Sequence, residues 1–142
     1  MPNLSRADLR SLEEYAEMRP TFRAQVMAYK KKRQASFGDH VRLYFEDALT
    51  IRYQIQEMMR VEHIVREADV QHELDTYNDV LGGPGEVGAT LLIEIDDPEL
   101  RDDLLVQWLE MPQHLYIAVE DGERVRATYD PRQVGDDRLS SV

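Results

Sequence analysis

The polar side chains that could carry out chemistry are concentrated on one predicted helix, residues 48–66. Its carboxylates, Glu57 and Glu62, could act as a general acid or base, with Arg60 beside them. Glu62 falls on the apolar stripe of this helix, where an unpaired carboxylate would be costly. The spacing also allows a structural role, because Glu57 can pair with Arg60 and Glu62 with Arg66. We favour the structural role and keep Glu57, Glu62 and Arg60 as the catalytic candidates.

A metal site is the second kind of chemistry to consider, with His63, His72 and Glu73 as candidate ligands. A ferritin-like di-iron site requires Glu-x-x-His pairs, but the residues three before these histidines are Arg60 and Asp69. The zinc-protease motif also fails, because no second histidine follows His72 at the required spacing. We therefore expect no cofactor, and a mononuclear metal ion is the alternative.

Composition excludes further classes of chemistry. The chain has no cysteine, so the protein itself offers neither a thiolate nucleophile nor an iron–sulfur ligand. The net charge is −11, yet residues 1–38 hold eight basic against four acidic residues. The run Lys30 to Arg33, including Lys31, could contact nucleic acid, but the overall charge opposes this. We favour packing of this basic segment beside the acidic remainder over binding of an acidic partner.

Apolar spacing and capping residues predict the elements that must position these side chains. Ser11 and Glu14 form a capping box before a helix that Pro20 should interrupt or restart. The continuation from Thr21 to Arg33 reads as helical, and Gly38 ends the element. The further predicted elements are a strand over 40–46, helices over 48–66 and 67–81, a strand over 90–95, a helix from Pro98 to Met111, and a hairpin of 114–120 and 123–129 across Asp121-Gly122.

This order, β-α-α-β-α-β-β, predicts an α+β fold with one four-stranded, mainly antiparallel sheet. Helices cover one face of the sheet, behind an N-terminal helical arm. We expect residues 1–130 to form a single domain, with a basic arm over 1–38 and an acidic body over 39–130, followed by a flexible tail over 131–142. The strand residues expected to share the core face are Val41, Leu43, Phe45, Leu91, Ile93, Ile95, Leu115, Ile117, Val119, Val125, Ala127 and Tyr129. On the opposite face Tyr44, Leu92 and Tyr116 are candidate anchors for a homodimer.

No apolar run approaches the ~20 residues that a membrane span requires. The N-terminus also lacks the charged and then apolar pattern of a secretory signal. We therefore expect a cytoplasmic protein without membrane contact.

Three stretches together resemble an uncharacterised bacterial and archaeal family, domain of unknown function 3501. They are Arg19-Pro20-Thr21-Phe22-Arg23, Phe45-Glu46 leading to Gln54-Ile55-Gln56-Glu57-Met58, and Glu73-Leu74-Asp75-Thr76-Tyr77-Asn78 leading to Ala89-Thr90-Leu91, with Ile93-Glu94-Ile95 as a further match. The resemblance brings no established activity. It implies a genomic context beside rubrerythrin-like and cysteine-rich iron–sulfur proteins, and therefore such proteins as partners.

These observations lead to three hypotheses of function. The first, which we favour, is a non-enzymatic accessory protein of a redox or oxidative-stress system. The second is a small carboxylate- or metal-dependent enzyme centred on the helices over 48–81. The third is a regulator that contacts nucleic acid through Lys30 to Arg33. The residues that we expect to contact a ligand or partner are Tyr53, Gln54, Gln56, Tyr77, Asn78, Arg23 and Lys31.

Overall fold

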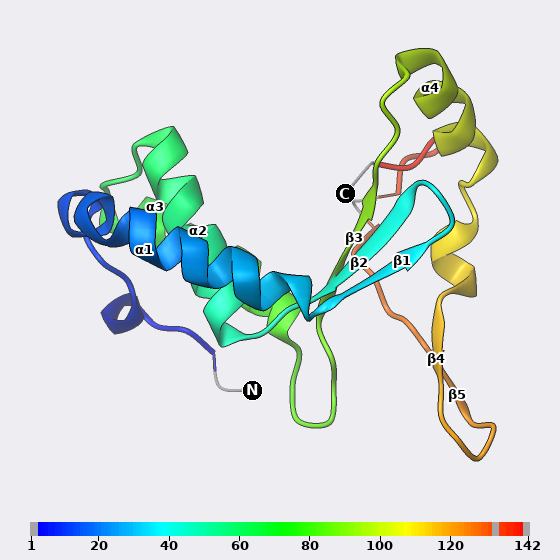
Figure 1. Cartoon of the computed structure of the whole chain (residues 1–142), viewed down its shortest axis with the longest axis horizontal. Coiled ribbons are helices and arrows are strands. Elements are labelled where there is room, and N and C mark those ends of the chain that lie inside the picture. The colour runs from blue at the N-terminus through cyan, green and yellow to red at the C-terminus, as the bar shows by residue number, and fades with distance from the viewer. Residues whose placement is uncertain (1–2, 132–133, 141–142) are drawn as a thin grey trace. The chain divides into compact units, whose positions relative to one another are not determined.

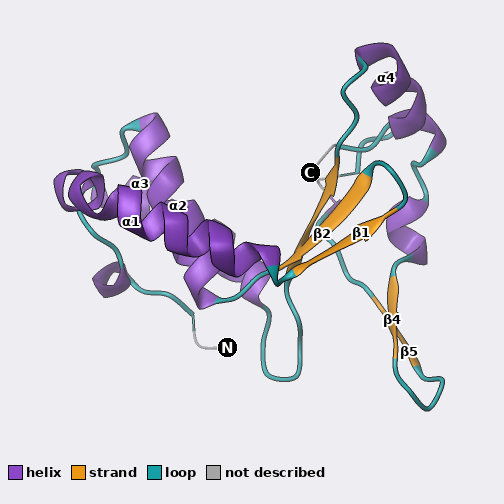
Figure 2. Cartoon of the chain, viewed as in Figure 1, coloured by secondary structure: helices purple, strands orange, loops and turns teal. Residues whose placement is uncertain are grey.

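The structure, a computed structural model, describes residues 3–131 and 134–140 and has the predicted α+β class (Figure 1). The helices are α1 Leu12–Lys31, α2 Ala48–Glu62, α3 Glu67–Leu81 and α4 Pro98–Gln107, with 3₁₀ turns at Arg6–Asp8 and Met111–His114. The strands are β1 Gln34–Phe37, β2 Val41–Phe45, β3 Ala89–Ile93, β4 Tyr116–Ala118 and β5 Arg124–Arg126 (Figure 2). No helix in the described part of the chain is long and apolar enough to cross a membrane.

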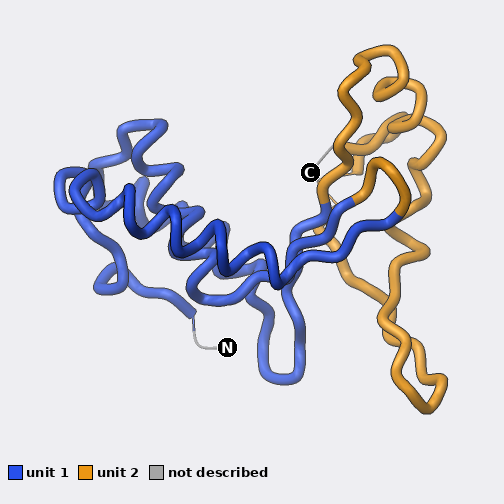
Figure 3. Tube along the Cα trace, in the orientation of Figure 1, with its two compact units in different colours: residues 1–37, 42–91 blue, residues 38–41, 92–142 orange. Residues whose placement is uncertain are grey.

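The chain divides into two compact units (Figure 3). Unit 1 comprises residues 1–37 and 42–91, and unit 2 comprises residues 38–41 and 92–142. All of the predicted site residues on α1, α2 and α3 fall in unit 1.

The helices of unit 1 are held together by two apolar clusters on opposite sides of α2, which packs against both α1 and α3 (Figure 1). One cluster joins α1 to α2 through the buried Tyr15, Phe22, Val26 and Tyr53. The other joins α2 to α3 through Ile51, Ile55, Met59, Val70, Leu74 and Leu81, with Leu9 of the N-terminal segment added. Burying each such side chain contributes about 1.5–3 kcal/mol. These clusters therefore fix which faces of α2 are turned toward its neighbours.

Helix α1 runs through Pro20 without a break, so the predicted interruption is wrong. Its start is as predicted, because the Ser11 side chain accepts a hydrogen bond from the Glu14 amide. A proline inside a helix costs about 3 kcal/mol, since it removes a hydrogen bond and crowds the preceding turn. Tyr15 on one side of Pro20 and Phe22 on the other are both buried against α2. Burial on both sides offsets the cost, and the helix continues.

The predicted single four-stranded sheet is also wrong. The structure has a three-stranded sheet in the order β1-β2-β3 and a separate β4-β5 pair. Strand β1 lies where the sequence predicts the end of the N-terminal helix. Gly38 adopts a φ of 62°, which favours glycine, between β1 and β2. Because Tyr44 and Leu92 lie on β2 and β3 and Tyr116 on β4, these three residues do not share one sheet face as predicted.

The predicted hairpin across Asp121-Gly122 is confirmed as an antiparallel β4-β5 pair, in which Ile117 lies opposite Val125. Its predicted place in the core is wrong, because Ile117 and Val125 are 53% and 55% exposed. Strand alternation identifies the residues that share a face, but it does not identify what covers that face. By contrast, Ile93 on β3 and Ile95 beyond it are buried, as predicted.

The C-terminal segment meets α4 within unit 2. Leu139 is buried, and its amide donates to the carbonyl of Leu105 at 3.0 Å. Arg138 forms an ion pair of 3.0 Å with Asp102. Of the tail predicted for 131–142, residues 132–133 and 141–142 lie outside the described residues.

Candidate functional site

Glu57 of α2 is the centre of the densest polar network in unit 1. Tyr53 and Glu57 lie four residues apart and therefore point toward α1 together. The hydroxyl of Tyr15 donates to Glu57 Oε2 at 2.7 Å. The guanidinium of Arg19 donates to both carboxylate oxygens at 2.9 Å, and that of Arg60 reaches both at 3.3 Å. The Glu57–Arg60 pairing that the sequence suggests is thus one part of a larger network.

This network holds Glu57 in its ionised form. The hydrogen bonds from Arg19 lower the pKa of Glu57 to about 2, against the opposing effect of burial. Burial raises the pKa of Tyr15, and its hydrogen bond to the Glu57 carboxylate raises it further. A carboxylate that accepts hydrogen bonds from three side chains has little capacity left for a substrate or a metal ion. The geometry is that of a structural ion pair between α1 and α2.

Glu62 does not lie on the buried stripe, as its place in the pattern suggests, but is exposed near the end of α2. Arg66, which the spacing predicts as its partner, lies 3.9 Å from Asp69. The exposure of Glu62 removes the cost of desolvation that made this residue conspicuous in the sequence.

Gln56 and Asn78 each clamp a segment of backbone. Gln56 is 1% exposed, and its side-chain amide accepts from the Arg10 N–H at 2.6 Å and donates to the Arg10 carbonyl at 3.2 Å. Asn78 repeats this arrangement with Leu4, at 2.8 and 2.9 Å. Each side-chain amide thus donates and accepts as a paired backbone peptide group does in a β-sheet. Both residues hold the N-terminal segment against α2 and α3, and their polar atoms are already in use.

The remaining predicted contact residues are dispersed. Tyr53 is buried between α1 and α2, where burial raises the pKa of its hydroxyl, and the charge of Arg23 on α1 acts in the opposite direction. Gln54 is half-buried, and Tyr77 packs against the cluster between α2 and α3. Lys31 is exposed. The structure therefore brings Tyr53 and Arg60 to Glu57, whereas Gln56 and Asn78 are engaged with the N-terminal segment.

The predicted metal ligands do not converge. Among residues 3–131 and 134–140, no three His, Asp or Glu side chains are close enough to hold a metal ion. His63 has a φ of 51° and ends α2, donating its amide to the Met59 carbonyl. His72 is exposed on α3. Burial raises the pKa of the half-buried Glu73, and the charge of Glu62 raises it further.

The basic run has partners inside unit 1. The Lys30 ammonium lies 4.9 Å from the centre of the Tyr44 ring. Arg33 donates to the Phe45 carbonyl at 3.2 Å and lies 3.6 Å from Asp47. Two of the four charged residues that could bind nucleic acid, Lys30 and Arg33, thus make contacts within the fold.

Asp47 is a structural residue that the sequence analysis missed. Its side chain accepts from the amides of Leu49 and Thr50 and caps the start of α2. It also accepts a hydrogen bond from the Tyr29 hydroxyl, near the end of α1. The signal was present, since an aspartate directly before a helical run is a common N-cap.

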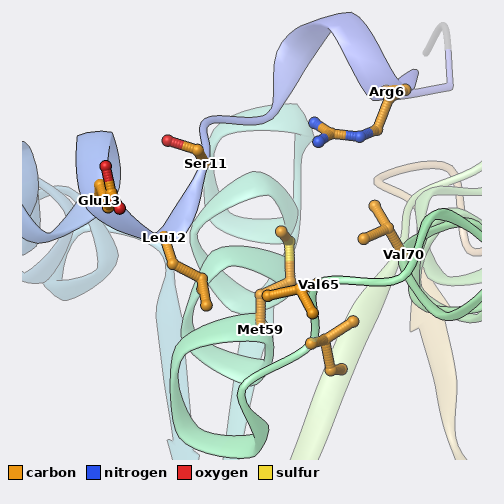
Figure 4. A pocket seen from close by; sticks show the side chains of 8 residues that line it. Arg6, Ser11, Leu12, Glu13, Met59, Val65 and Val70 are labelled. Atoms are coloured by element: carbon orange, nitrogen blue, oxygen red, sulfur yellow. The ribbon is translucent and has the colours of Figure 1, made fainter.

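An apolar groove is the second site in unit 1, and the sequence analysis did not predict it (Figure 4). It has a volume of about 530 Å³. Its lining residues are Arg6, Ser11, Leu12, Glu13, Met59, Ile64, Val65 and Val70. Val65 is 69% exposed, and Val61 of α2 is 57% exposed. Arg6 is tied to Glu67 by an ion pair of 2.9 Å. The groove is therefore an apolar surface with charged residues at its rim.

Comparison with known proteins identifies the family. Residues 3–142 match the family described as "Protein of unknown function (DUF3501)". The chain belongs to this family. The crystal structure of a novel protein of unknown function from Burkholderia pseudomallei K96243 is similar to this chain, with 37% sequence identity and a TM-score of 0.92, covering 99% of this chain and 74% of that one. No curated protein matches the chain. The resemblance seen in the sequence is thus confirmed, and the family brings no activity with it.

Proposed function

We propose that this member of the DUF3501 family is a non-enzymatic accessory protein that binds another protein through the apolar groove of unit 1. The observation that carries the proposal is the groove itself, in which the exposed Val65 stands beside Met59 and Leu12. Exposed apolar surface that is rimmed by polar residues is typical of protein interaction sites.

The state of the polar side chains also supports a binding role. Glu57, the carboxylate with the largest pKa change, is occupied by Arg19, Arg60 and Tyr15. No buried side-chain nitrogen or oxygen in the described part of the chain lacks a hydrogen-bond partner. A catalytic centre commonly holds groups that await a substrate, whereas these groups stabilise the fold.

The charge of the protein indicates which class of partner would fit the groove. The chain carries a net charge of −11, and Glu13 at the groove begins an acidic turn with Glu14. A partner with a basic surface and an apolar anchor would complement both features. The assignment to a redox system rests on the family resemblance alone, which points to rubrerythrin-like and iron–sulfur proteins.

Calorimetric titration with a purified rubrerythrin-like protein tests the proposal. Val65→Asp places a charge in the groove and should weaken binding by at least about tenfold, or 1.4 kcal/mol. Val87→Asp is the matched control, because Val87 is 66% exposed and lies outside the groove. If the two variants bind the partner equally well, the groove is not the binding site. If the wild-type protein does not bind the rubrerythrin-like protein, the proposed redox class of partner is wrong.

The raised pKa of Glu73 is the one observation that favours an enzyme on α2 and α3. Elemental analysis of protein purified without a metal-affinity tag decides between the two functions. Stoichiometric iron, manganese or zinc that is lost in Glu73→Ala and His63→Ala would favour the enzyme and overturn the accessory role.

A further inference from the structure

The β4-β5 pair of unit 2 is apolar and exposed at the same time. Ile117 and Val125, which lie opposite each other, are 53% and 55% exposed, and Val119 beyond them is 44% exposed. An isolated two-stranded pair is marginally stable in water, and additional strands or packing are needed for independent stability. This pair is therefore a place where further strand pairing would stabilise the fold.

The two outer edges of the pair differ in charge. Strand β5 carries Arg124 and Arg126, which are the kind of residues that keep an edge strand from pairing with another chain. Strand β4 and its flanking residues, 115–119, contain no charged residue. An uncharged, apolar edge of this kind is a template for strand addition. The β4 edge is thus the one that is suited to pairing.

Hydrogen bonding within the pair shows which backbone groups point outward. The Val119 amide donates to the Glu123 carbonyl at 2.7 Å, and Ile117 bonds to β5 in the same alternating pattern. The backbone groups of Tyr116 and Ala118 therefore point away from β5. Both residues are exposed.

We propose that two copies of the chain associate through their β4 edges, antiparallel and centred on Ile117. In this register the outward groups of Tyr116 bond to those of Ala118 in the second copy, and Ala118 bonds to Tyr116 in return. Ile117 lies opposite its own counterpart in a non-hydrogen-bonded pair. The product is a four-stranded sheet in the order β5-β4-β4-β5.

Charge favours the β4 edge over the β5 edge and allows a second copy of the chain to pair there without repulsion between the strands. Residues 115–119 paired with themselves bring no like charges together. The equivalent pairing through β5, centred on Val125, would place Arg124 opposite Arg126 of the second copy, and like charges opposite each other destabilise a sheet. The dimer lies in unit 2 and does not depend on the proposed function, whose groove is in unit 1.

The absence of cysteine allows a direct test of the register. A cysteine at position 117 would face its counterpart across a non-hydrogen-bonded pair, where Cα atoms lie about 4.5 Å apart, within the range of a disulfide. Ile117→Cys should therefore form a disulfide-linked dimer with oxidised glutathione. Val125→Cys, on the same face but one strand away, should stay monomeric on a non-reducing gel. Equal cross-linking of both variants would overturn the register.

Sedimentation equilibrium tests the association itself. The wild-type mass should rise toward twice the 16.6 kDa of one chain as the concentration increases to about 200 μM. Ala118→Pro removes an outward amide but no bond to β5, and Ile117→Lys places two like charges opposite each other. Each should raise the dimer Kd at least about tenfold, whereas Val125→Lys should change it less than about threefold.

Two results would overturn the dimer. One is a wild-type protein that remains monomeric up to about 200 μM. The other is a dimer that persists unchanged in both Ile117→Lys and Ala118→Pro. Circular dichroism of each variant shows whether it is folded, and Ile117→Lys alters only an exposed side chain. A failure here leaves the Val65→Asp experiment unaffected, so that the two proposals fail separately.

Discussion

For Glu57, the sequence reveals one ion-pair partner but not the others. Its spacing from Arg60 is visible in the sequence, and that pair is present at 3.3 Å. Its stronger partners, Tyr15 and Arg19, lie 42 and 38 residues earlier in the chain. They are brought to Glu57 only when α1 packs on α2. The sequence therefore suggested a structural ion pair with Arg60 but not the partners on α1, because those contacts are long-range.

We expect Glu57→Gln to lower the free energy of unfolding by about 2–3 kcal/mol at pH 7, since hydrogen bonds to a charged group are the stronger kind. The folded-state pKa of about 2 lies below the usual 4.5. The stabilisation is therefore complete above about pH 4.5 and is lost as the pH falls toward 2. Urea denaturation from pH 7 down to pH 3 should show the difference between wild type and variant shrinking.

Glu62→Gln is the control for this series, because Glu62 is exposed. It should change stability by less than about 0.5 kcal/mol. A Glu57→Gln variant with wild-type stability at pH 7 would show that the network contributes nothing net.

At the scale of elements, local signals predicted the helices better than the sheets. The predicted cap Ser11 is found at the start of α1, α4 begins at Pro98 as predicted, and α3 has the predicted bounds. Strand β1 was missed because Phe37 alone among its four residues is a strong strand former, and the strand follows directly on a helix. The continuity of α1 through Pro20 was missed because buried contacts on either side outweigh a local cost.

Pro20→Ala should stabilise the protein by about 1–3 kcal/mol, because it restores the missing amide and relieves crowding in the preceding turn of α1. The measurement is the urea midpoint at constant slope. Glu17→Ala, at an exposed position on the same helix, should change stability by less than about 0.5 kcal/mol. A loss of stability in Pro20→Ala would mean that the proline ring makes contacts worth more than the hydrogen bond.

Leu139→Ala should destabilise unit 2 by about 2–4 kcal/mol, since Leu139 is 4% exposed beside α4. Hydrogen exchange at the Leu139 amide, which bonds to Leu105, should become faster in the variant. Arg138→Ala removes only an exposed ion pair with Asp102 and should cost less than about 1 kcal/mol. Rapid exchange of the Leu139 amide in the wild type would contradict the docking of this segment.

At the scale of the whole molecule, the order of the predicted elements indicated the α+β class, and the distribution of charged residues along the chain showed the uneven charge. Neither pattern could predict how the strands are distributed between two separate sheets. The hairpin residues Ile117 and Val125 have the same alternating pattern as Leu43 and Phe45, yet the first pair is more than half exposed and the second is half-buried. Whether an apolar face is covered depends on the placement of other elements, which a single strand does not encode.

Charge at this scale predicts that the protein does not bind DNA. Lys30 and Arg33 are engaged within unit 1, and the net charge of −11 repels phosphate. Fluorescence anisotropy with a labelled duplex should show no binding at about 50 mM salt and about 100 μM protein. Binding that falls steeply with salt and is lost in Lys31→Ala would support the nucleic-acid regulator instead.

The amide clamps at Gln56 and Asn78 set the order in which unit 1 can be completed during synthesis. Their targets, Arg10 and Leu4, precede them by 46 and 74 residues. Contacts of such long sequence separation form late, because a long loop must close first. The segment that contains Leu4 and Arg10 is synthesised before α2 and α3 and has no docking site until both helices have followed it. Leu4 and Arg10 are therefore among the last residues of unit 1 to be held in place.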